Sequence, residues 1–429
     1  MQSQHKQRLR HNFTVNVLDG AFFGIGIGIA SFYSVIPLFV ATLTSSNIFI
    51  GLSSQLHWIG WHFPQLFTAN RVAGLTRYKP MVILMTIHER VPFLGLAIVA
   101  LLVPHIPRQA ALILTFALLI WQGLGGGLTA TAWQSMINKV MPTDLRGTFY
   151  GLQSAAASLF SAGGAVAAGV LLQAIESPIN FALCFFIASL AMAASGGFLA
   201  WTREPEHPAG DIRPSPTLGA LVERLRAIIR SDSNFNWFIT ARILLQGADM
   251  ARAFFAIYAV RQFGAGEELI GIVTGVSMLA QMVANPLLGW LGDRFSHRVI
   301  LAGGAGMMFL SIVAALAATS TTALYFVFGL SGVAVAGLWT TVLAISAQFG
   351  RDAERPYYLG LGNTLIAPAA LIAPLIGGAL ADSFGYNVTF ITAACCALGA
   401  MALLLFKVRT PHPALYPVEI PSVVHSGAD

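Results

Sequence analysis

The chain has 429 residues, of which 56% are hydrophobic and 10% are charged. Soluble domains have about 25% charged residues, so this composition, with a mean hydropathy of +0.71, excludes an ordinary soluble protein and indicates a membrane protein with many spans. A net charge of +6 would also suit a nucleic-acid-binding protein, but the positions of the basic residues explain it otherwise.

Twelve apolar runs are long enough to cross a bilayer, whose hydrocarbon core of about 30 Å needs roughly 20 residues of helix. The pattern therefore predicts an all-α polytopic membrane protein with twelve transmembrane helices. We expect one helix in each of Asn16–Leu43, Ile48–Ala69, Met81–Val103, Ala110–Met136, Thr148–Ala174, Ile179–Trp201, Asn236–Gln262, Leu269–Leu291, Val299–Ala318, Ala323–Ala347, Tyr357–Leu380 and Val388–Phe406.

The Lys and Arg residues gather in alternate loops. With the N-terminus inside, 19 of the 24 fall on the inner face, whereas the loops of the opposite face have only Arg108 and Arg261. Cytoplasmic loops carry such an excess. We therefore expect both termini in the cytoplasm and the chain in the plasma (inner) membrane, with the lipid bilayer as a partner and no nucleic acid.

The chain is expected to divide into two six-helix halves, residues 1–201 and 236–408. Between them, residues 202–235 are predicted to form a cytoplasmic linker, in which apolar residues at helical spacing indicate an amphipathic helix on the inner leaflet. The tail, residues 409–429, contains four prolines and is expected to be disordered.

Ionisable residues within a span cost about 3 kcal/mol each on insertion scales, so they are candidates for function. Asp19 lies close to the inner end of the first span and is expected to pair with a loop or to take part in a gate. Glu89 and Arg90 are adjacent in the third span. They either hold helices together or form a site for a proton or a charged substrate.

The seventh span is the most highly charged. Arg242, Gln246 and Asp249 fall on one face of a helix, and Arg252 lies one turn from Asp249. Two interpretations remain open from the sequence: a buried ion pair that fixes helix packing, or a site at which Asp249 exchanges a proton.

Polar residues also follow helical spacing in the second span, where Gln55, Trp58 and His62 form a stripe. This stripe faces either a neighbouring helix or a water-filled cavity. Further hydrogen-bonding groups within spans are Gln122, Gln281 and Asn285. No spacing of His and Cys supports a metal site, and neither a metal nor a cofactor is expected.

A short charged segment follows the eighth span and contains Gly289, Gly292, Asp293, Arg294 and Arg298. The glycines are expected to let the chain turn sharply and to let backbones approach closely. Asp293 is expected to accept hydrogen bonds from backbone N–H groups at the start of a neighbouring helix, where an anion is favoured. The two arginines are expected to anchor at lipid head groups.

This segment resembles the cytoplasmic loop signature of the major facilitator superfamily, which lies between helices 2 and 3 of that family and recurs, usually weaker, between helices 8 and 9. The two halves also echo each other, because Arg146-Gly147 and the residues after it match Arg355-Pro356 and the residues after it at a constant offset. Such internal repeats characterise secondary transporters of this family. The resemblance implies two pseudo-symmetric six-helix bundles. It also implies that Asp293 engages the start of the fifth span, at Arg146 and Gly147.

The counterpart of this segment in the first half runs from Pro64 to Arg71 and has neither the acid nor the turn glycine. The backbone N–H groups at the start of the eleventh span therefore have no aspartate in this loop to which they could donate hydrogen bonds. We expect only packing or water-bridged contacts there, and hence an asymmetric inner gate with one charged latch at Asp293.

The resemblance implies a secondary transporter, not an enzyme, that moves a small organic solute by alternating access. Proton-coupled efflux is the first expectation and rests on Asp249 and Glu89, with the solute and protons as partners and the chain as a monomer. One alternative is an uptake symporter or uniporter for a sugar-like or carboxylate solute held by Arg242 and Arg252. Another is a non-transporting assembly factor or sensor of the same family.

Overall fold

The structure is a computed structural model. It describes residues 2–32, 34–45, 47–62, 64–205, 218–264, 267–351 and 354–410. The predicted disorder of the tail concerns residues 409–429, of which 411–429 lie outside the described residues.

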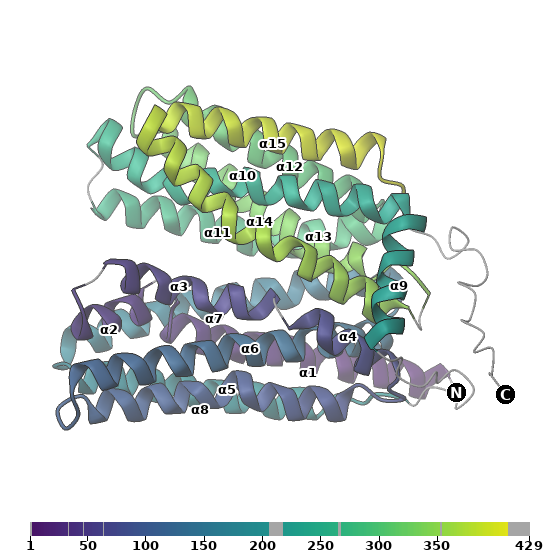
Figure 1. The fold of residues 1–429 in the computed structure, drawn as a ribbon, viewed down its shortest axis with the longest axis horizontal. Helices are drawn as coiled ribbons and strands as arrows, with labels where there is room; N and C mark the ends of the chain where they lie inside the picture. Colours follow the sequence, from purple (N-terminus) through teal and green to yellow (C-terminus); the bar gives the residue numbers. More distant parts are fainter. Residues whose placement is uncertain are drawn as a thin grey trace.

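Two bundles of long helices lie one against the other (Figure 1). The first contains α1 (Gln2–Ile29), α2 (Val35–Leu43), α3 (Asn47–His62), α4 (Gln65–Ala73), α5 (Lys79–Leu102), α6 (Arg108–Val140), the 3-10 turn η1 (Thr143–Leu145), α7 (Arg146–Ala174) and α8 (Ile179–Ala200). The second contains α10 (Ser233–Phe263), α11 (Glu267–Arg294), α12 (His297–Leu316), α13 (Ala323–Ser346), α14 (Arg355–Phe384) and α15 (Tyr386–Phe406). Helix α9 (Leu218–Ser231) lies at the end of the molecule where α1 begins, which we call the α9 end.

The all-α membrane fold predicted from the sequence is confirmed. The described residues contain no strand, and nine of their helices are long and apolar enough to cross a membrane by length and composition. The three predicted spans outside these nine correspond to the α3–α4 pair, α10 and α11. A count of twelve transmembrane helices therefore stays a prediction.

Two spans predicted as continuous helices are broken, so that part of the prediction was wrong. The first span is divided into α1 and α2, and the second into α3 and α4. Proline accounts for both breaks, because it has no amide proton for the helical hydrogen bond and its ring clashes with the preceding turn. Pro37 lies in the first turn of α2, and Pro64 directly precedes α4.

Each bundle is packed by aromatic and small side chains. Phe93 and Phe185 are fully buried among alanines in the first bundle, as are Phe255 and Phe390 in the second. Lipid tails are as apolar as these side chains, so close packing rather than the hydrophobic effect holds such helices together.

The bundles meet most closely where α7 lies along α11. A Cβ placed on Gly289 would overlap the carbonyl oxygen of Gly147, and one placed on Gly151 would overlap the carbonyl oxygen of Asn285. Because these glycines have no side chain, the two helices can approach this closely.

Replacing Gly289 by valine should force the bundles apart. Overpacking of this kind costs about 1–3 kcal/mol, so we expect a melting temperature several degrees lower in detergent, measured by intrinsic fluorescence. Gly303→Val on α12 is the matched control, because a Cβ there has no heavy atom within 4 Å. Equal melting temperatures for the two variants would contradict this role of Gly289.

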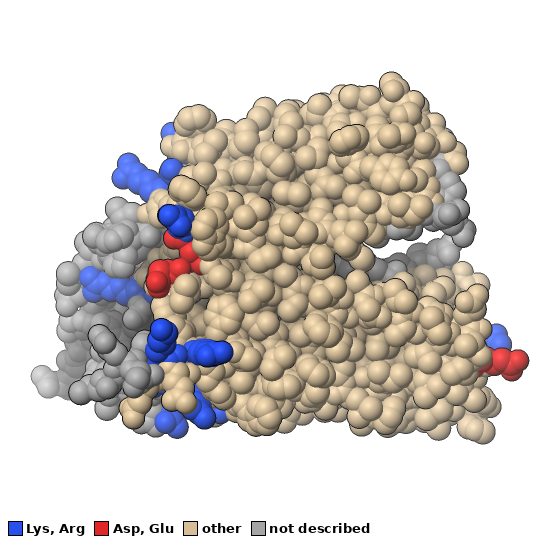
Figure 2. Space-filling view, turned by 180° about the vertical axis from the view of Figure 1, so that it is seen from behind, with Lys and Arg blue, Asp and Glu red and all other residues tan. Residues whose placement is uncertain are grey.

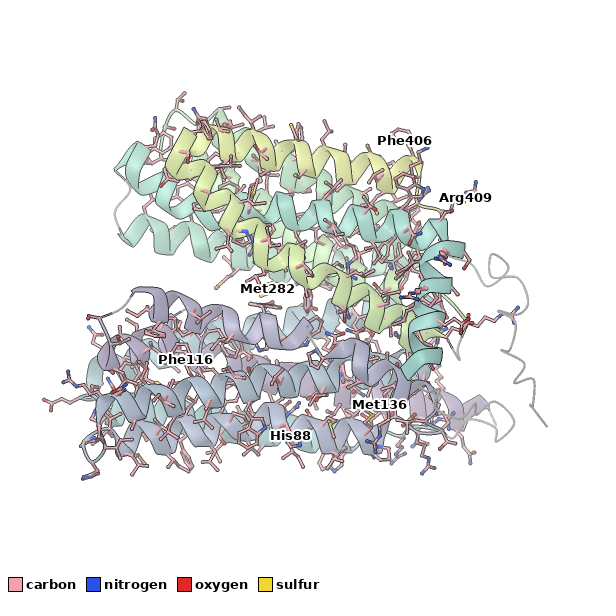
Figure 3. The ribbon with its side chains drawn as sticks, viewed as in Figure 1. His88, Phe116, Met136, Met282, Phe406 and Arg409 are labelled. Atoms are coloured by element: carbon pink, nitrogen blue, oxygen red, sulfur yellow. The ribbon has the colours of Figure 1, made fainter. Side chains whose placement is uncertain are left out.

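The bundles separate at the end opposite α9, where a cleft opens between them (Figure 2). The Lys and Arg side chains visible in that view gather mostly at the α9 end. Helix α15 finishes at this end as well, near Phe406 and Arg409 (Figure 3). Helix α9 packs Leu225 and Ile228 against the second bundle, in one cluster with Phe235. The molecule is thus closed at the α9 end and open at the other.

Candidate functional site

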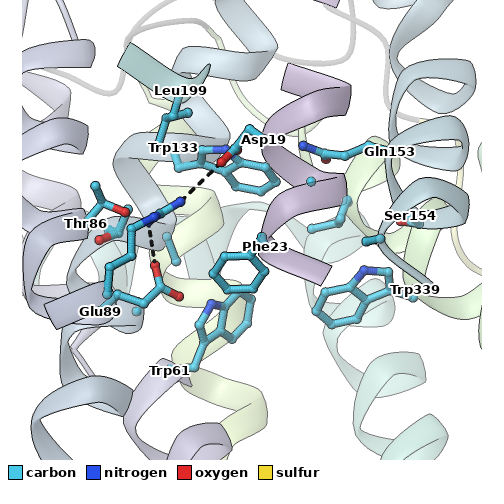
Figure 4. Close-up of a pocket in the computed structure, with 17 residues that line it drawn as sticks. Asp19, Phe23, Trp61, Thr86, Glu89, Trp133, Gln153, Ser154, Leu199 and Trp339 are labelled. Carbon is cyan, nitrogen blue, oxygen red and sulfur yellow. Dashed lines mark hydrogen bonds and ion pairs between the residues drawn. The ribbon is translucent and has the colours of Figure 1, made fainter. Parts of the chain in front are cut away.

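Three helices bring two acids, a base and a serine together inside the first bundle. Figure 4 shows the two acids, Asp19 and Glu89. Arg90 Nη2 donates hydrogen bonds to Asp19 Oδ1 at 3.2 Å and to Ser195 Oγ at 2.9 Å. Ser195 Oγ donates in turn to Asp19 Oδ1 at 2.5 Å. Arg90 Nη1 lies 3.5 Å from Glu89 Oε2, and Arg90 Nε donates to the carbonyl oxygen of Met192. The guanidinium therefore ties α1, α5 and α8 together.

This acid cluster, defined by Asp19, Glu89 and Arg90, has one more acid than base. The three residues are only 5%, 7% and 9% exposed. Among the described residues, Arg90 is the only basic side chain within ion-pair distance of either acid. A buried charge is costly unless it is paired. The cluster can reach charge balance by taking up one proton or one external cation.

Glu89 is the acid less firmly held by the cluster. Asp19 accepts two hydrogen bonds, whereas the Glu89 carboxylate meets Arg90 only at 3.5 Å. Glu89 Oε1 points toward α6, because a Cβ placed on Gly126 would lie 3.0 Å from it. The same Cβ would lie 3.2 Å from Trp61 Cδ1. The carboxylate thus lies beside an indole ring.

A cavity of about 200 Å³ adjoins the acid cluster. Its aromatic walls are Phe23 of α1, Trp61 of α3, Trp133 of α6 and Trp339 of α13 (Figure 4). The ring of Trp339 lies 6.1 Å from the rings of both Trp58 and Trp61. These contacts cross from one bundle to the other, so a molecule in the cavity would touch both bundles.

Asp19 does not pair with a loop, contrary to one expectation from the sequence, but with Arg90 and Ser195. Helix α1 begins at Gln2 rather than near Asn16, so Asp19 lies about 25 Å along the helix at 1.5 Å per residue. It contacts α5 and α8 instead of a loop. His88, next to Glu89, lies on another side of α5, where its Nδ1 accepts a hydrogen bond from Trp121 Nε1 at 3.1 Å (Figure 3).

The charged residues of α10 divide between two contacts. Asp249 and Arg252 form an ion pair with hydrogen bonds of 2.7 and 3.0 Å, and their side chains are 37% and 45% exposed. Arg242 is buried and its Nη2 donates to Asn363 Oδ1 at 3.2 Å. Gln246 is half-buried and is in neither contact. Because Asp249 has its own arginine, this pair is already balanced in charge.

The remaining polar candidates form contacts between or within helices. The side chains of Gln55 and His62 lie outside the described residues. The others pair as follows: Gln122 with His57 at 3.0 Å, Asn285 with Thr340 at 2.8 Å, and Gln281 with the carbonyl oxygen of Ser277 at 3.3 Å.

Asp293 joins the two bundles at the α9 end. Its Oδ1 accepts a hydrogen bond from the backbone N of Gly147 at 2.7 Å, and its Oδ2 accepts one from Thr148 N at 2.5 Å. His297 Nε2 lies 3.3 Å from Oδ1. Free N–H groups and the helix dipole favour an anion at the start of α7. Arg146 instead bonds to carbonyl oxygens at the end of α6. The predicted contact of Asp293 with this helix start is therefore present.

The predicted sharp turn at the glycines is wrong. Helix α11 continues through Arg294, so Gly289 and Gly292 lie inside the helix. Because the helix is unbroken, Gly289 packs closely against α7 and Asp293 lies in the last turn of α11. Arg294 lies over the ring of Trp290 at 5.5 Å, and Arg298 donates to a backbone carbonyl just after α15 at 2.7 Å.

Comparison with known proteins agrees with this architecture. The family model described as Major Facilitator Superfamily matches residues 243–422. The crystal structure of a bacterial homologue of the iron transporter ferroportin, in an outward-facing state, has a TM-score of 0.73 over 92% of this chain and 98% of its own. The chain thus resembles the major facilitator superfamily in sequence over residues 243–422 and in fold over most of its length. A proton:xylose symporter of this superfamily gives a TM-score of 0.72 over 94% of this chain and 97% of its own. Identities of 14% and 16% to these two structures show a shared fold alone.

Curated relatives match over shorter stretches. The chain is 34% identical to the probable vesicular acetylcholine transporter-B of Danio rerio over 141 residues, which are 33% of this chain and 29% of that protein. The vesicular acetylcholine transporter of Homo sapiens is 34% identical over 146 residues, or 34% and 27% of the two chains. An uncharacterized MFS-type transporter of Bacillus subtilis (strain 168), YuxJ, is 30% identical over 145 residues, or 34% and 36%. The matched segments span 27–36% of the length of these three relatives.

The protein also has a direct polar contact on the other side, where α4 lies along α14. Asn363 Nδ2 donates to Gln65 Oε1 at 2.6 Å, and Asn363 Oδ1 accepts from Arg242. Gly360 packs against Ala69 in the same region. The prediction of packing or water-bridged contacts alone was therefore wrong, because two amide side chains meet without an acid.

Proposed function

We propose that the protein is a secondary active transporter, which moves a small organic solute by alternating access and exchanges it for a proton bound at Glu89. The observation that carries this proposal is the acid cluster with one uncompensated carboxylate beside a cavity that both bundles line. A site shared by two bundles changes shape when they rock against each other, which is how members of this superfamily alternate access.

The arrangement of the two ends supports alternating access. The α9 end is closed by the Asp293 contact, and the opposite end has a cleft (Figure 2). Basic residues gather at the α9 end, as expected for a cytoplasmic face. In this orientation both termini are cytoplasmic and the cleft faces outward. Rocking about the α7–α11 contact would close the cleft and release Asp293.

The acid cluster is a better site for proton exchange than α10. Asp249 is half-exposed and bonded twice to Arg252, so a proton there would break a balanced pair. Glu89 is buried and shares one arginine with Asp19. A proton on Glu89 leaves the Asp19–Arg90 pair intact and makes the cluster neutral.

Proteoliposomes that contain a pH-sensitive dye and are screened with a panel of small organic solutes test the proposal. At least one solute should move protons against its own flux, and an imposed pH gradient should drive its accumulation. Asp249→Asn should keep this response within about twofold, because Asp249 lies outside the proposed site. If no solute moved protons, or if Asp249→Asn abolished the response, the proposal would be overturned.

A further inference from the structure

We infer that the cavity binds an organic monocation, and that this cation and the proton compete for Glu89 so that one replaces the other. The inference rests on the proposed function and specifies the class of its substrate. It draws on three features of the cavity: the charge of the acid cluster, the aromatic walls, and the short distance between the Glu89 carboxylate and the ring of Trp61.

The charge of the acid cluster favours a cation. With Asp19 and Glu89 ionised and Arg90 protonated, the cluster is short of one positive charge. An anionic substrate would add a second unpaired charge to a buried site. Arg90 cannot serve such an anion readily, because its Nε, Nη1 and Nη2 already contact Met192, Glu89, Asp19 and Ser195.

The walls of the cavity also favour a cation. Four aromatic side chains line it, and an aromatic face attracts a cation within about 6 Å of the ring centre, most strongly when water is excluded. One such face is already used in this way, since the guanidinium of Arg90 lies 5.5 Å from the ring centre of Phe23. The rings of Trp61, Trp133 and Trp339 also line the cavity and can contact a ligand there.

The Glu89 carboxylate lies beside one of the aromatic walls, Trp61. Glu89 Oε1 and Trp61 Cδ1 both lie within 3.2 Å of the position a Gly126 Cβ would occupy. They are therefore close enough for one ammonium group to contact both. Trp339 comes from the other bundle and is 43% exposed, which leaves this wall accessible to an entering ligand.

Binding and proton uptake then exclude each other. When Glu89 is protonated, the cluster is neutral and offers no charge to a cation. When the cation is bound, it balances the charge of the Glu89 carboxylate, so the cluster is neutral without a bound proton. Each exchange moves one proton against one monocation.

Calorimetric titration of the purified full chain with choline and benzyltrimethylammonium tests the inference, with 3,3-dimethylbutan-1-ol as the neutral isostere of choline. At least one of the two cations should bind, and choline, if it binds, should do so at least tenfold more tightly than its isostere. Affinity for a bound cation should fall at least tenfold as the pH is lowered through the titration of Glu89. Glu89→Gln should lose at least tenfold in affinity and the pH dependence with it, whereas Glu89→Asp should keep part of both.

Matched variants separate this site from general damage. Trp61→Leu should weaken binding several-fold and Trp61→Phe less, whereas Trp121→Leu, on the exposed side of α6, should bind as the native chain does. Binding of neither cation, equal affinity for choline and its isostere, or full affinity in Glu89→Gln would each overturn the inference. Proton-driven flux of a neutral or anionic solute would then still support the proposed function. Cation binding without proton movement would instead overturn the proton exchange in the proposed function, while the cation site would stand.

Discussion

Replacing Glu89 by glutamine should uncouple transport from the pH gradient while the protein stays folded. The substitution keeps the shape of the side chain and removes the one carboxylate of the acid cluster that has no base of its own. In proteoliposomes, accumulation of solute driven by a pH gradient should fall at least tenfold. Because an unpaired buried charge opposes folding, the melting temperature should stay the same or rise.

A melting temperature that does not fall is what makes this prediction specific. A packing role for Glu89, in which the carboxylate only holds α5 against its neighbours, predicts lower stability with proton coupling retained. Glu89→Asp should retain coupling in part, since it keeps the charge and shortens the reach by one methylene. Gradient-driven accumulation that survives in Glu89→Gln would remove Glu89 from the coupling role.

The sequence predicted the class of fold because composition and span length leave few choices for a chain with so few charges. It also predicted the partner of Asp293, since the motif and the internal repeat together indicate the helix start at Gly147. Breaks within spans were missed at Pro37 and Pro64. A proline is tolerated in some membrane helices and ends others, so its effect depends on neighbours that the sequence does not show.

The site was predicted only in pieces. Glu89 and Arg90 stood out because charges within spans are rare, but their partner Ser195 did not, since a serine in an apolar helix is common and carries no signal of its own. Asp19 was expected to pair with a loop or to take part in a gate, because its partners Arg90 and Ser195 lie far from it in the sequence. The exposed pair Asp249–Arg252 looked as significant as the acid cluster. Only the packing of α1, α5 and α8 distinguishes a balanced surface pair from an unbalanced buried cluster.

Replacing Asp293 by alanine should shift the protein toward states that are open at the α9 end. Two hydrogen bonds from Gly147 N and Thr148 N would be lost, and both N–H groups would be left without their partner in the closed contact. Hydrogen bonds to a charged group contribute about 1.5–3 kcal/mol each. A net loss of about 3 kcal/mol corresponds to a roughly 100-fold change in the ratio of closed to open states.

Cysteine labelling measures this shift. Ala344 of α13 is fully buried in a cluster with Tyr150, Val72 and other residues of the first bundle, so a cysteine there becomes reactive only when the α9 end opens. With Cys184, Cys395 and Cys396 replaced, Ala344→Cys in the purified, detergent-solubilised protein should be labelled at least tenfold faster by a polar maleimide after Asp293→Ala.

The neighbouring Arg294 supplies the matched control for this latch. Its guanidinium lies over Trp290 of the same helix, so Arg294→Ala removes a charge at the adjacent position in the chain without breaking the contact between bundles. Labelling in Arg294→Ala should stay at the native rate. If Asp293→Ala labelled no faster than Arg294→Ala, the close packing of Gly289 against Gly147 and the Gln65–Asn363 hydrogen bond would suffice to hold the α9 end shut. The charged contact would then orient the bundles without governing when they open.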